Sequence, residues 1–496
     1  MSARTSNTNV RIAGLGLLIA ITVLFIGLRL VNIEADFPSG MTFSTALYTD
    51  EGWHLSGAVN LIVTGQWYVR GDFNPAVNLP VGHLIQAATF STFGMSLASA
   101  RATVVVCFAL LVALVFMLSR KYAGLLAAVF ASFFLSVNFF AFAYSRLAIL
   151  EILMSIFVML ALWTVSSLPQ KNNLGVIVLS SLVLVVAMLT KSTAISTLPA
   201  FMYLSSARGK GLREKALFAA VAAVLFAVAL SLYNLLASQA YYEDFYYFKN
   251  LALDDRFSPS LLDMVQNFGV AILKARRIEP LIYFFTVLSS LFLCFRVPDY
   301  RKNLLVQTAA LWMLSYFGVL SVTSYHPSRY FLPLIIPVSM LFGIVVASLQ
   351  KLLGQRSAVF AQVLLVAFIL VANGYRIVDY VSTPKFTFLE MAQDVRDIMQ
   401  ADGAPDSLLL GNFASTVSLA TGVPFTNTAL STQTVAEKLE TLDPQFYLSL
   451  GQEPDVVSAL SEGYELQPMS EWDVFDNYRN GDKVHLFKLS RKGAAG

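Results

Sequence analysis

The sequence is poor in charged residues. Only 13% of its 496 residues are Asp, Glu, Lys or Arg, and the net charge is +3, whereas a soluble domain carries roughly 25% charged residues. This composition excludes an ordinary soluble protein, and we expect no nucleic-acid partner. Hydrophobic residues make up 56% of the chain and the mean hydropathy is +0.65. Apolar runs of about 20 residues recur, long enough to cross a membrane, so we predict a polytopic membrane protein.

Cysteine is nearly absent. Cys107 and Cys294 both fall inside apolar runs, so we expect no structural disulfide outside the membrane. Spacings of Cys and His that are typical of a zinc site are lacking. The first apolar run also lacks the small-residue ending of a cleaved signal peptide, so we interpret residues 11–31 as a retained first span.

The apolar runs predict eleven membrane spans. Lys and Arg accumulate in alternate connecting loops, which places those loops and the N-terminus in the cytoplasm and the chain after residue 374 outside. The predicted spans lie near residues 11–31, 98–119, 122–143, 147–167, 174–190, 193–206, 215–237, 280–296, 304–322, 331–349 and 357–374.

Three segments lie outside the predicted spans on the outer side. Two are loops of the membrane domain (residues 1–374), at residues 32–97 and 238–279, and the third is the tail, residues 375–496, with 17 Asp and Glu against 9 Lys and Arg. Strand-like and helix-like runs alternate in the tail, so we predict a small extracytoplasmic α/β domain there. Its main signals are the capping boxes Thr387-x-x-Glu390 and Thr434-x-x-Glu437 and the strand-like runs SLLLGN (407–412), QFYLSL (445–450) and KVHLFKLS (483–490).

Ionisable residues recur at the outer ends of the predicted spans. Because a charge inside a membrane protein is costly, each suggests a function. Each also has a simpler explanation, such as an interfacial position for Arg101 or a private ion pair between Arg146 and Glu151. Their common depth favours one shared polar site. The residues at this depth are Asp50, Glu51, Arg101, Arg146, Glu151, Lys191, His326 and Arg329.

The chemistry of such a site follows from its residue types. Several cations suit a phosphate or diphosphate group, a carboxylate suits deprotonation of an attacking hydroxyl, and an apolar groove between spans suits a prenyl chain. Together they predict transfer of a sugar from a lipid-phosphate carrier to a hydroxyl acceptor at the outer face of the membrane.

Five stretches also carry a resemblance to a known class. They are TDEGWHLSGAVNLIVTGQW, SLASARATVV, AYSRLAILEILMSIFVMLALW, MLTKSTAI and SRYFLPLIIPVSMLFG. In this order they resemble the GT-C class of membrane glycosyltransferases, in particular the dolichyl-phosphate-mannose protein mannosyltransferases and the bacterial aminoarabinose transferases acting on lipid A. The resemblance covers about residues 12–350 and implies a GT-C-like helical bundle, a polyprenyl-phosphate sugar donor and an inverting displacement.

The resemblance also implies roles for individual residues. Asp50 is the expected general base on the acceptor hydroxyl, and Glu51 is expected to position it or the acceptor. The expected ligands of the donor phosphate are Arg101, Arg146, Lys191 and Arg329. Supporting roles are expected for His54, His83, Glu151, His326 and Tyr330. Among these, His54 and His83 are expected as polar walls, and Tyr330 is expected to pack on the sugar or the lipid.

The sequence departs from the class in one segment. Many relatives have a Lys-Pro-Pro or Pro-Pro-Leu stretch after the first outer helix, whereas NPAVNLPVGHLIQ stands here, with its prolines apart and no lysine. This departure puts the donor and acceptor preference in question. Some relatives use a divalent metal ion and others do not. Asp50 and Glu51 with His83 or His326 could supply ligands, so metal dependence stays open.

Two functions other than sugar transfer are also compatible with the sequence. A transporter or flippase of an anionic lipid-linked sugar would place its site near the midplane and show internal repeats, and we find neither sign. A non-catalytic scaffold with a partner-binding tail is the other alternative. The predicted location is a bacterial plasma membrane, and neither the sugar nor the acceptor, whether protein, lipid or glycan, is identified by the sequence.

Overall fold

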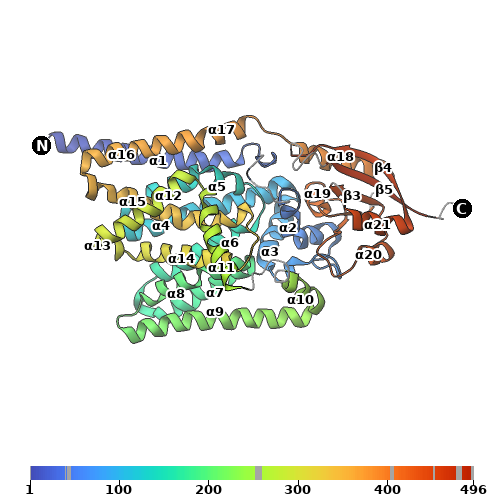
Figure 1. Cartoon of the computed structure of the whole chain (residues 1–496), viewed down its shortest axis with the longest axis horizontal. Coiled ribbons are helices and arrows are strands. Elements are labelled where there is room, and N and C mark those ends of the chain that lie inside the picture. The colour runs from blue at the N-terminus through green and yellow to red at the C-terminus, as the bar shows by residue number, and fades with distance from the viewer. Residues whose placement is uncertain are drawn as a thin grey trace.

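The protein is a long helical bundle that carries a small sheet domain at one end (Figure 1). A computed structural model describes residues 2–38, 41, 46–251, 260–402, 407–450, 453–475 and 483–492. The N-terminus lies at the end of the bundle far from the sheet domain. The predicted all-α membrane bundle with a C-terminal α/β domain is confirmed.

Long apolar helices build the bundle. Eight helical segments of the described ranges are long and apolar enough to cross a membrane, and the apolar α12 is slightly shorter. The bundle contains α1 (Ser2–Gly27), α4 (Leu97–Val137), α5 (Phe139–Tyr144), α6 (Leu150–Ser167), α7 (Asn173–Thr190), α8 (Leu198–Ser206), α9 (Leu212–Ala240), α12 (Pro280–Arg296), α13 (Pro298–Arg301), α14 (Leu304–Ser321), α15 (Ile335–Leu353), α16 (Gln355–Ile369) and α17 (Tyr375–Ser382). The 3₁₀-helices η1 (Leu28–Leu30), η4 (Ser192–Thr197) and η6 (Ser328–Leu334) lie at helix ends within it.

The helix α4 supplies two of the predicted spans. Gly124 interrupts it with a φ of 88°, a conformation that glycine adopts without a steric penalty. Arg101 near the start of α4 donates to the Ile33 carbonyl, and Arg146 beyond its end donates to the Val31 carbonyl. Both ends of this segment therefore lie at the same end of the bundle, so the chain crosses it and returns.

One predicted span, near residues 193–206, is not a continuous α-helix. It is divided into η4 and the short α8. The hydroxyls of Ser196 and Thr197 each donate at 2.7 Å to a carbonyl three residues earlier, and such bonds compete with the regular helical pattern. This irregular stretch leaves Lys191 at the junction between α7 and η4.

Helices from the predicted outer loops cover one end of the bundle. These are α2 (Ala46–Thr64) and α3 (Pro80–Phe93) from the first loop, and α10 (Tyr242–Leu251) and α11 (Leu261–Lys274) from the second. Pro80 opens α3, where its missing N–H costs no helical hydrogen bond. Because α2 and α3 lie between the bundle and the sheet domain (Figure 1), residues on α2 can contact both.

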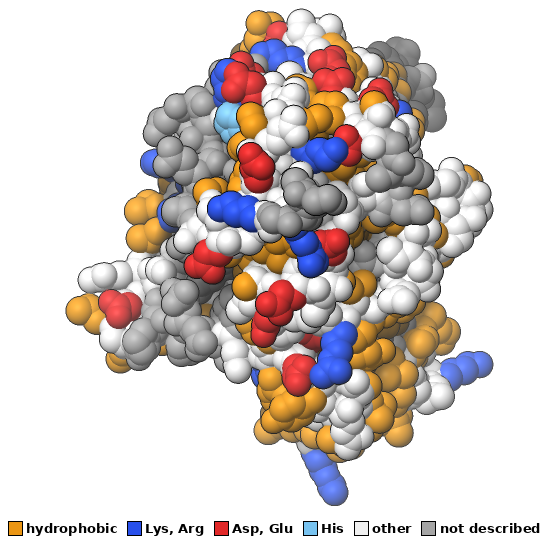
Figure 2. Space-filling view, turned by 90° about the vertical axis from the view of Figure 1, so that its right-hand side faces the viewer, with side chains coloured by type: hydrophobic (Ala, Val, Ile, Leu, Met, Phe, Trp, Pro, Cys, Tyr) orange, Lys and Arg blue, Asp and Glu red, His pale blue; other side chains and the backbone are white. Residues whose placement is uncertain are grey.

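The C-terminal domain is a mixed sheet with helices. The strands have the order β2-β1-β3-β5-β4; β1 runs parallel to β2 and β3, and β5 runs antiparallel to β3 and β4. Acidic and basic side chains are spread over its outer face (Figure 2). Its elements are α18 (Thr387–Ala401), β1 (Leu409–Gly411), α19 (Ala414–Thr421), β2 (Phe425–Thr426), α20 (Val435–Leu442), β3 (Phe446–Leu450), α21 (Pro454–Gly463), β4 (Tyr464–Trp472) and β5 (Val484–Arg491).

Only one of the two predicted capping boxes forms. Thr434 and Glu437 cap α20 reciprocally, as expected. The box predicted at Thr387 is wrong, although the helix α18 is present, because Thr387 is the first helical residue and a distant acid caps the helix. The carboxylate of Asp36 accepts from the backbone N–H groups of Thr387 at 2.9 Å and Phe388 at 3.2 Å.

Buried polar contacts fix the sheet domain to the helices that cover this end of the bundle. Nζ of Lys438 on α20 lies 2.8 Å from Oδ1 of Asp72, which follows α2, and both side chains are buried. Thr432 donates to Asp244 on α10 at 2.9 Å. Together with the cap from Asp36, these contacts attach the domain to three different segments of the chain.

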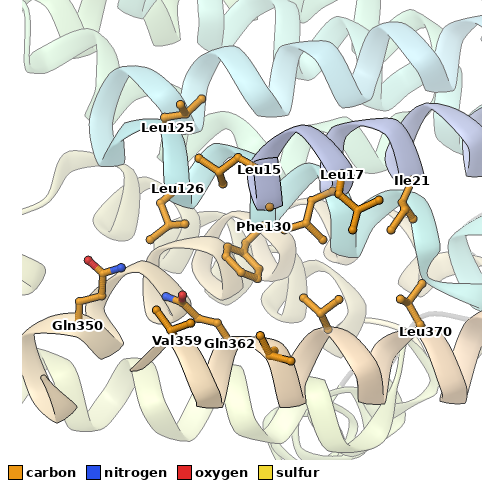
Figure 3. A pocket seen from close by; sticks show the side chains of 14 residues that line it. Leu15, Leu17, Ile21, Leu125, Leu126, Phe130, Gln350, Val359, Gln362 and Leu370 are labelled. Atoms are coloured by element: carbon orange, nitrogen blue, oxygen red, sulfur yellow. The ribbon is translucent and has the colours of Figure 1, made fainter. Parts of the chain in front are cut away.

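A cavity of about 610 Å³ lies between α1, α4 and α16 (Figure 3). Aliphatic side chains and Phe130 line it, with the amides of Gln350 and Gln362 as its polar side chains. Lacking an ionisable side chain in its wall, the cavity suits a hydrocarbon chain rather than acid–base chemistry. The charged residues near the sheet domain are therefore the better candidates for the reaction site.

Candidate active site

The helix α2 buries the Asp50–Glu51 pair. Each of these two residues is only 4% exposed, in a helix that lies between the bundle and the sheet domain. A buried carboxylate is costly unless a charged or hydrogen-bonding partner compensates it. The partners of the two acids therefore define the site, and they differ.

Asp50 is paired with Arg329. Oδ2 of Asp50 lies 2.7 Å from Nη1 of Arg329, a residue of η6 just before α15. Burial raises the pKa of Asp50 to about 6, although the neighbouring Arg329 acts in the opposite direction. A carboxyl group with this pKa is ionised at neutral pH and is a better proton acceptor than a solvated aspartate.

Glu51 forms a closed pair with Arg101. Nε and Nη2 of Arg101 donate to the two oxygens of Glu51 at 2.9 and 2.6 Å, and the backbone N–H of Ala148 donates to the same carboxylate at 2.7 Å. Nη1 of Arg101 donates to the carbonyls of Ile33 and Ala35, both at 2.9 Å. Most donors of this guanidinium are thus engaged within the protein, so its main effect is to hold Glu51 in place.

A third acid, Glu151, is fully buried in the first turn of α6. Its Oε1 lies 3.1 Å from Nζ of Lys191 and 3.8 Å from Nε of Arg329. The helix N-terminus adds a favourable dipole for the negative charge. Arg329 therefore stands between Asp50 and Glu151, and Lys191 approaches the same oxygen of Glu151.

Three further predicted residues lie near these ion pairs or on the neighbouring helices α2 and α3: Tyr330, His54 and His83. The ring of Tyr330 lies 5.5 Å from Nζ of Lys191 and 5.3 Å from the guanidinium carbon of Arg329, measured to its centroid. On α2, burial lowers the pKa of His54 well below its usual value, and the two cations add to this effect. On α3, burial lowers the pKa of His83 to about 3. Both imidazoles are therefore neutral polar groups.

Arg146 does not join the cluster. It is buried and donates to the carbonyls of Val31, at 2.8 Å, and Asn32. Its guanidinium carbon lies 4.8 Å from the centroid of the Tyr380 ring. The ion pair with Glu151 that spacing alone allowed is not formed, because the short segment between α5 and α6 directs this arginine toward the end of α1.

His326 also lies apart from the acids. Its Nε2 lies 2.7 Å from the carbonyl oxygen of Leu320, and the charged groups that it faces are Lys274 and Arg277. In the part of the chain that the structure describes, no three metal-ligating side chains come together. The ligand group suggested by the sequence, Asp50 and Glu51 with His83 or His326, is therefore not assembled.

Arg29 is a buried cation that was not predicted. It lies in η1, directly after α1, where it donates to the Ser145 hydroxyl at 2.7 Å and to the carbonyls of Phe25 at 2.6 Å and Ser136 at 3.0 Å. Its guanidinium carbon lies 4.0 Å from the centroid of the Phe108 ring. The sequence contains a signal for this residue, because it is a cation at the end of an apolar run. Its contacts join the end of α1 to α4 and to the end of α5.

The site thus combines a basic carboxylate with two neighbouring cations. Asp50, Arg329, Glu151 and Lys191 form a chain of buried ion pairs, and Tyr330 supplies an aromatic ring beside it. This arrangement can bind an anionic group through the two cations and accept a proton at Asp50.

Comparison with known proteins gives the fold a class. A family model described as dolichyl-phosphate-mannose-protein mannosyltransferase matches residues 75–233, and no curated protein sequence matches the chain. ArnT from Cupriavidus metallidurans, solved bound to undecaprenyl phosphate, has a TM-score of 0.63 at 14% identity over 96% of this chain and 98% of its own. Archaeal oligosaccharyltransferase AglB from Archaeoglobus fulgidus, solved with an inhibitory peptide and a dolichol-phosphate, has a TM-score of 0.52 at 11% identity over 95% and 74%.

The chain has the GT-C fold. The structural similarity to ArnT extends over nearly the whole of both chains. The similarity therefore includes the C-terminal domain. The family-model match includes Glu151 and Lys191 but leaves Asp50 and Arg329 outside its bounds. The charged cluster is therefore completed by residues on either side of the matched segment.

Proposed function

We propose that this protein transfers a sugar from a polyprenyl-phosphate donor to a hydroxyl acceptor, with inversion at the sugar. The observation that carries the proposal is the chain of buried ion pairs from Asp50 through Arg329 and Glu151 to Lys191. The GT-C fold supports it, as do the polyprenyl phosphates, undecaprenyl phosphate and dolichol-phosphate, bound to two proteins of similar fold.

Asp50 is the proposed general base. It takes the proton of the acceptor hydroxyl while the hydroxyl oxygen forms a bond to the anomeric carbon of the sugar. The bond from that carbon to the phosphate oxygen breaks, and the polyprenyl phosphate leaves with the bonding electrons. The raised pKa of Asp50 suits this role, because proton transfer is most effective when the pKa of the base lies near the working pH.

Arg329 and Lys191 are the proposed ligands of the donor phosphate. Their charges balance the negative charge that develops on the leaving phosphate, so we expect transfer to continue after divalent ions are chelated. Tyr330, beside both cations, is the proposed surface for the sugar or the first prenyl unit, while His54 and His83 contribute neutral polar walls. The Glu51–Arg101 pair holds the acidic end of α2.

We propose that the site faces the non-cytoplasmic side of a bacterial plasma membrane. This orientation follows from the accumulation of Lys and Arg in alternate loops of the sequence. Reporter fusions at residue 351, at the end of α15, and at residue 383, before the sheet domain, are expected to report opposite sides. Fusions that place both on one side contradict the orientation.

Asp50→Asn tests the function directly. First, mass spectrometry of envelope lipids and proteins, with and without the gene, identifies the sugar-sized mass that is lost and hence a donor and acceptor for assay. In purified membranes, Asp50→Asn is then expected to lower the transfer rate by about 10² to 10⁴-fold while binding of undecaprenyl phosphate persists. Glu243→Gln is the matched control, because Glu243 is an exposed acid on α10. Unchanged transfer by Asp50→Asn eliminates Asp50 as the base.

A further inference from the structure

The sheet domain contacts α2 immediately beside the acidic pair. The backbone N–H of Gly52 donates to Oγ1 of Thr416 on α19 at 3.2 Å. The two backbones approach so closely that a Cβ atom at position 52 would lie 2.2 Å from the backbone nitrogen of Thr416 and 2.4 Å from the carbonyl carbon of Ser415. Only glycine fits at this position, which follows Glu51 directly.

A second contact follows at the next residue of α2. Nε1 of Trp53 donates to the carbonyl of Asn412 at 2.9 Å, and Asn412 lies between β1 and α19. Two successive residues of α2 thus bind one short segment of the sheet domain. That segment is itself rigid, because β1 pairs on both sides with β2 and β3 and the first six residues of α19 are buried.

We propose that α19 is a positioning element for the base, with Thr416 as its main positioning residue. Thr416 and the absence of a side chain at Gly52 set the depth of α2 against the sheet domain, and hence the position from which Asp50 reaches Arg329. This inference rests on the proposed function of Asp50. A displacement of about 1 Å in a catalytic group can lower a rate by 10²-fold, so a contact two residues from Asp50 is close enough to matter.

The attachment of the domain does not depend on Thr416. Lys438 pairs with Asp72, Thr432 donates to Asp244, and Asp36 caps α18. A change at Thr416 therefore disturbs the contact beside the base while these other contacts hold the domain. Positioning of the base can thus be separated by experiment from docking of the domain.

The test uses four variants of the full-length protein in lipid nanodiscs. Gly52→Ala is expected to lower kcat for sugar transfer by at least tenfold, since the added Cβ forces α2 away from α19. Thr416→Val, which removes the hydrogen bond, is expected to lower kcat severalfold, and Thr416→Ser to restore it. Thr432→Val is the matched control, because it removes a hydrogen bond between the same domain and α10 rather than α2, and its kcat is expected to match the wild type.

A second measurement distinguishes positioning from general damage. Binding of undecaprenyl phosphate is expected to be at least as tight as in the wild type in all four variants, because Arg329 and Lys191 are unchanged and a displaced Asp50 competes less for Arg329. The inference is overturned if the Thr416 variants lose both undecaprenyl phosphate binding and kcat. It is also overturned if Thr416→Val and Gly52→Ala both keep the wild-type kcat. If Gly52→Ala does not fold, kcat and undecaprenyl phosphate binding of Thr416→Val and Thr416→Ser test the inference without it. Normal transfer by Asp50→Asn would instead refute the proposed function on which the inference rests.

Discussion

The side chains of Asp50 and Arg329 meet at 2.7 Å, although Asp50 belongs to α2 and Arg329 to the segment before α15. The same guanidinium is 3.8 Å from Glu151. Arg329 is thus both the partner of the proposed base and a proposed ligand of the donor phosphate. A phosphate that binds Arg329 competes with Asp50, so donor binding and release of the base are coupled through one side chain.

The first prediction concerns the pH dependence of transfer. Asp50 acts as a base only when it is deprotonated, and burial raises its pKa to about 6. The value of kcat/KM for the donor, which reports the free enzyme, should therefore fall below pH 6, by about tenfold for each further pH unit. At saturating donor the acid limb of kcat should lie at higher pH, because bound phosphate removes Arg329 from Asp50 and adds a negative charge nearby.

Initial rates from pH 5 to 8 at low and at saturating donor measure this effect. The Glu243→Gln control should show the wild-type profile. A rate independent of pH across this range would contradict Asp50 as the base, whereas coincident limbs for kcat/KM and kcat would contradict only the competition for Arg329.

The second prediction concerns donor binding by Lys191. Lys191→Met removes a cation and leaves its methylene stem, and is expected to weaken undecaprenyl phosphate binding by about 10- to 100-fold, because a hydrogen bond to a charged group contributes about 1.5–3 kcal/mol. Lys191→Arg should retain most of the affinity. Lys351→Ala serves as the control, since Lys351 is exposed at the end of α15 and 3.7 Å from the exposed Asp299. Wild-type affinity in Lys191→Met would remove this residue from the donor site.

The shared depth of the charged residues could be predicted from sequence, whereas their pairing could not. Depth requires only the position of a residue relative to the end of an apolar run, which hydropathy shows directly. Pairing depends on the rotation of each helix about its axis and on the path of short connections. Arg146 is at the predicted depth, yet the turn before α6 directs it to backbone carbonyls of the segment after α1.

The same reasoning explains the two capping boxes. A box uses only neighbours within the sequence, and Thr434 and Glu437 form one. The sequence from Thr387 to Glu390 fits a capping box equally well. There, however, Asp36 from the other end of the chain caps the N-terminus of α18 in place of the predicted box. The contact between α2 and α19 could not be predicted from the local sequence either. Nothing in the residues around Gly52 shows that Thr416 of α19 packs against it.

The third prediction concerns the stability of the Glu51–Arg101 pair. Glu51→Gln leaves the charge of Arg101 buried without its partner, which typically costs about 3–5 kcal/mol, so the melting temperature in detergent should fall clearly. The control is Glu471→Gln, which removes an exposed partner 2.6 Å from Lys483 and should change stability by less than about 1 kcal/mol. Equal, small shifts in the two variants would show that the pair adds little to the fold.

The fourth prediction separates two roles for Arg146. The sequence predicts that it binds the donor phosphate, whereas the structure engages its guanidinium with the carbonyls of Val31 and Asn32. If the role is structural, Arg146→Met should lower the melting temperature, because buried carbonyls lose a charged donor worth about 1.5–3 kcal/mol. The folded fraction should still bind undecaprenyl phosphate within twofold of the wild-type affinity. Binding by titration and melting in the same nanodisc preparation measure both, and weakened binding with an unchanged melting temperature would assign Arg146 to the donor site after all.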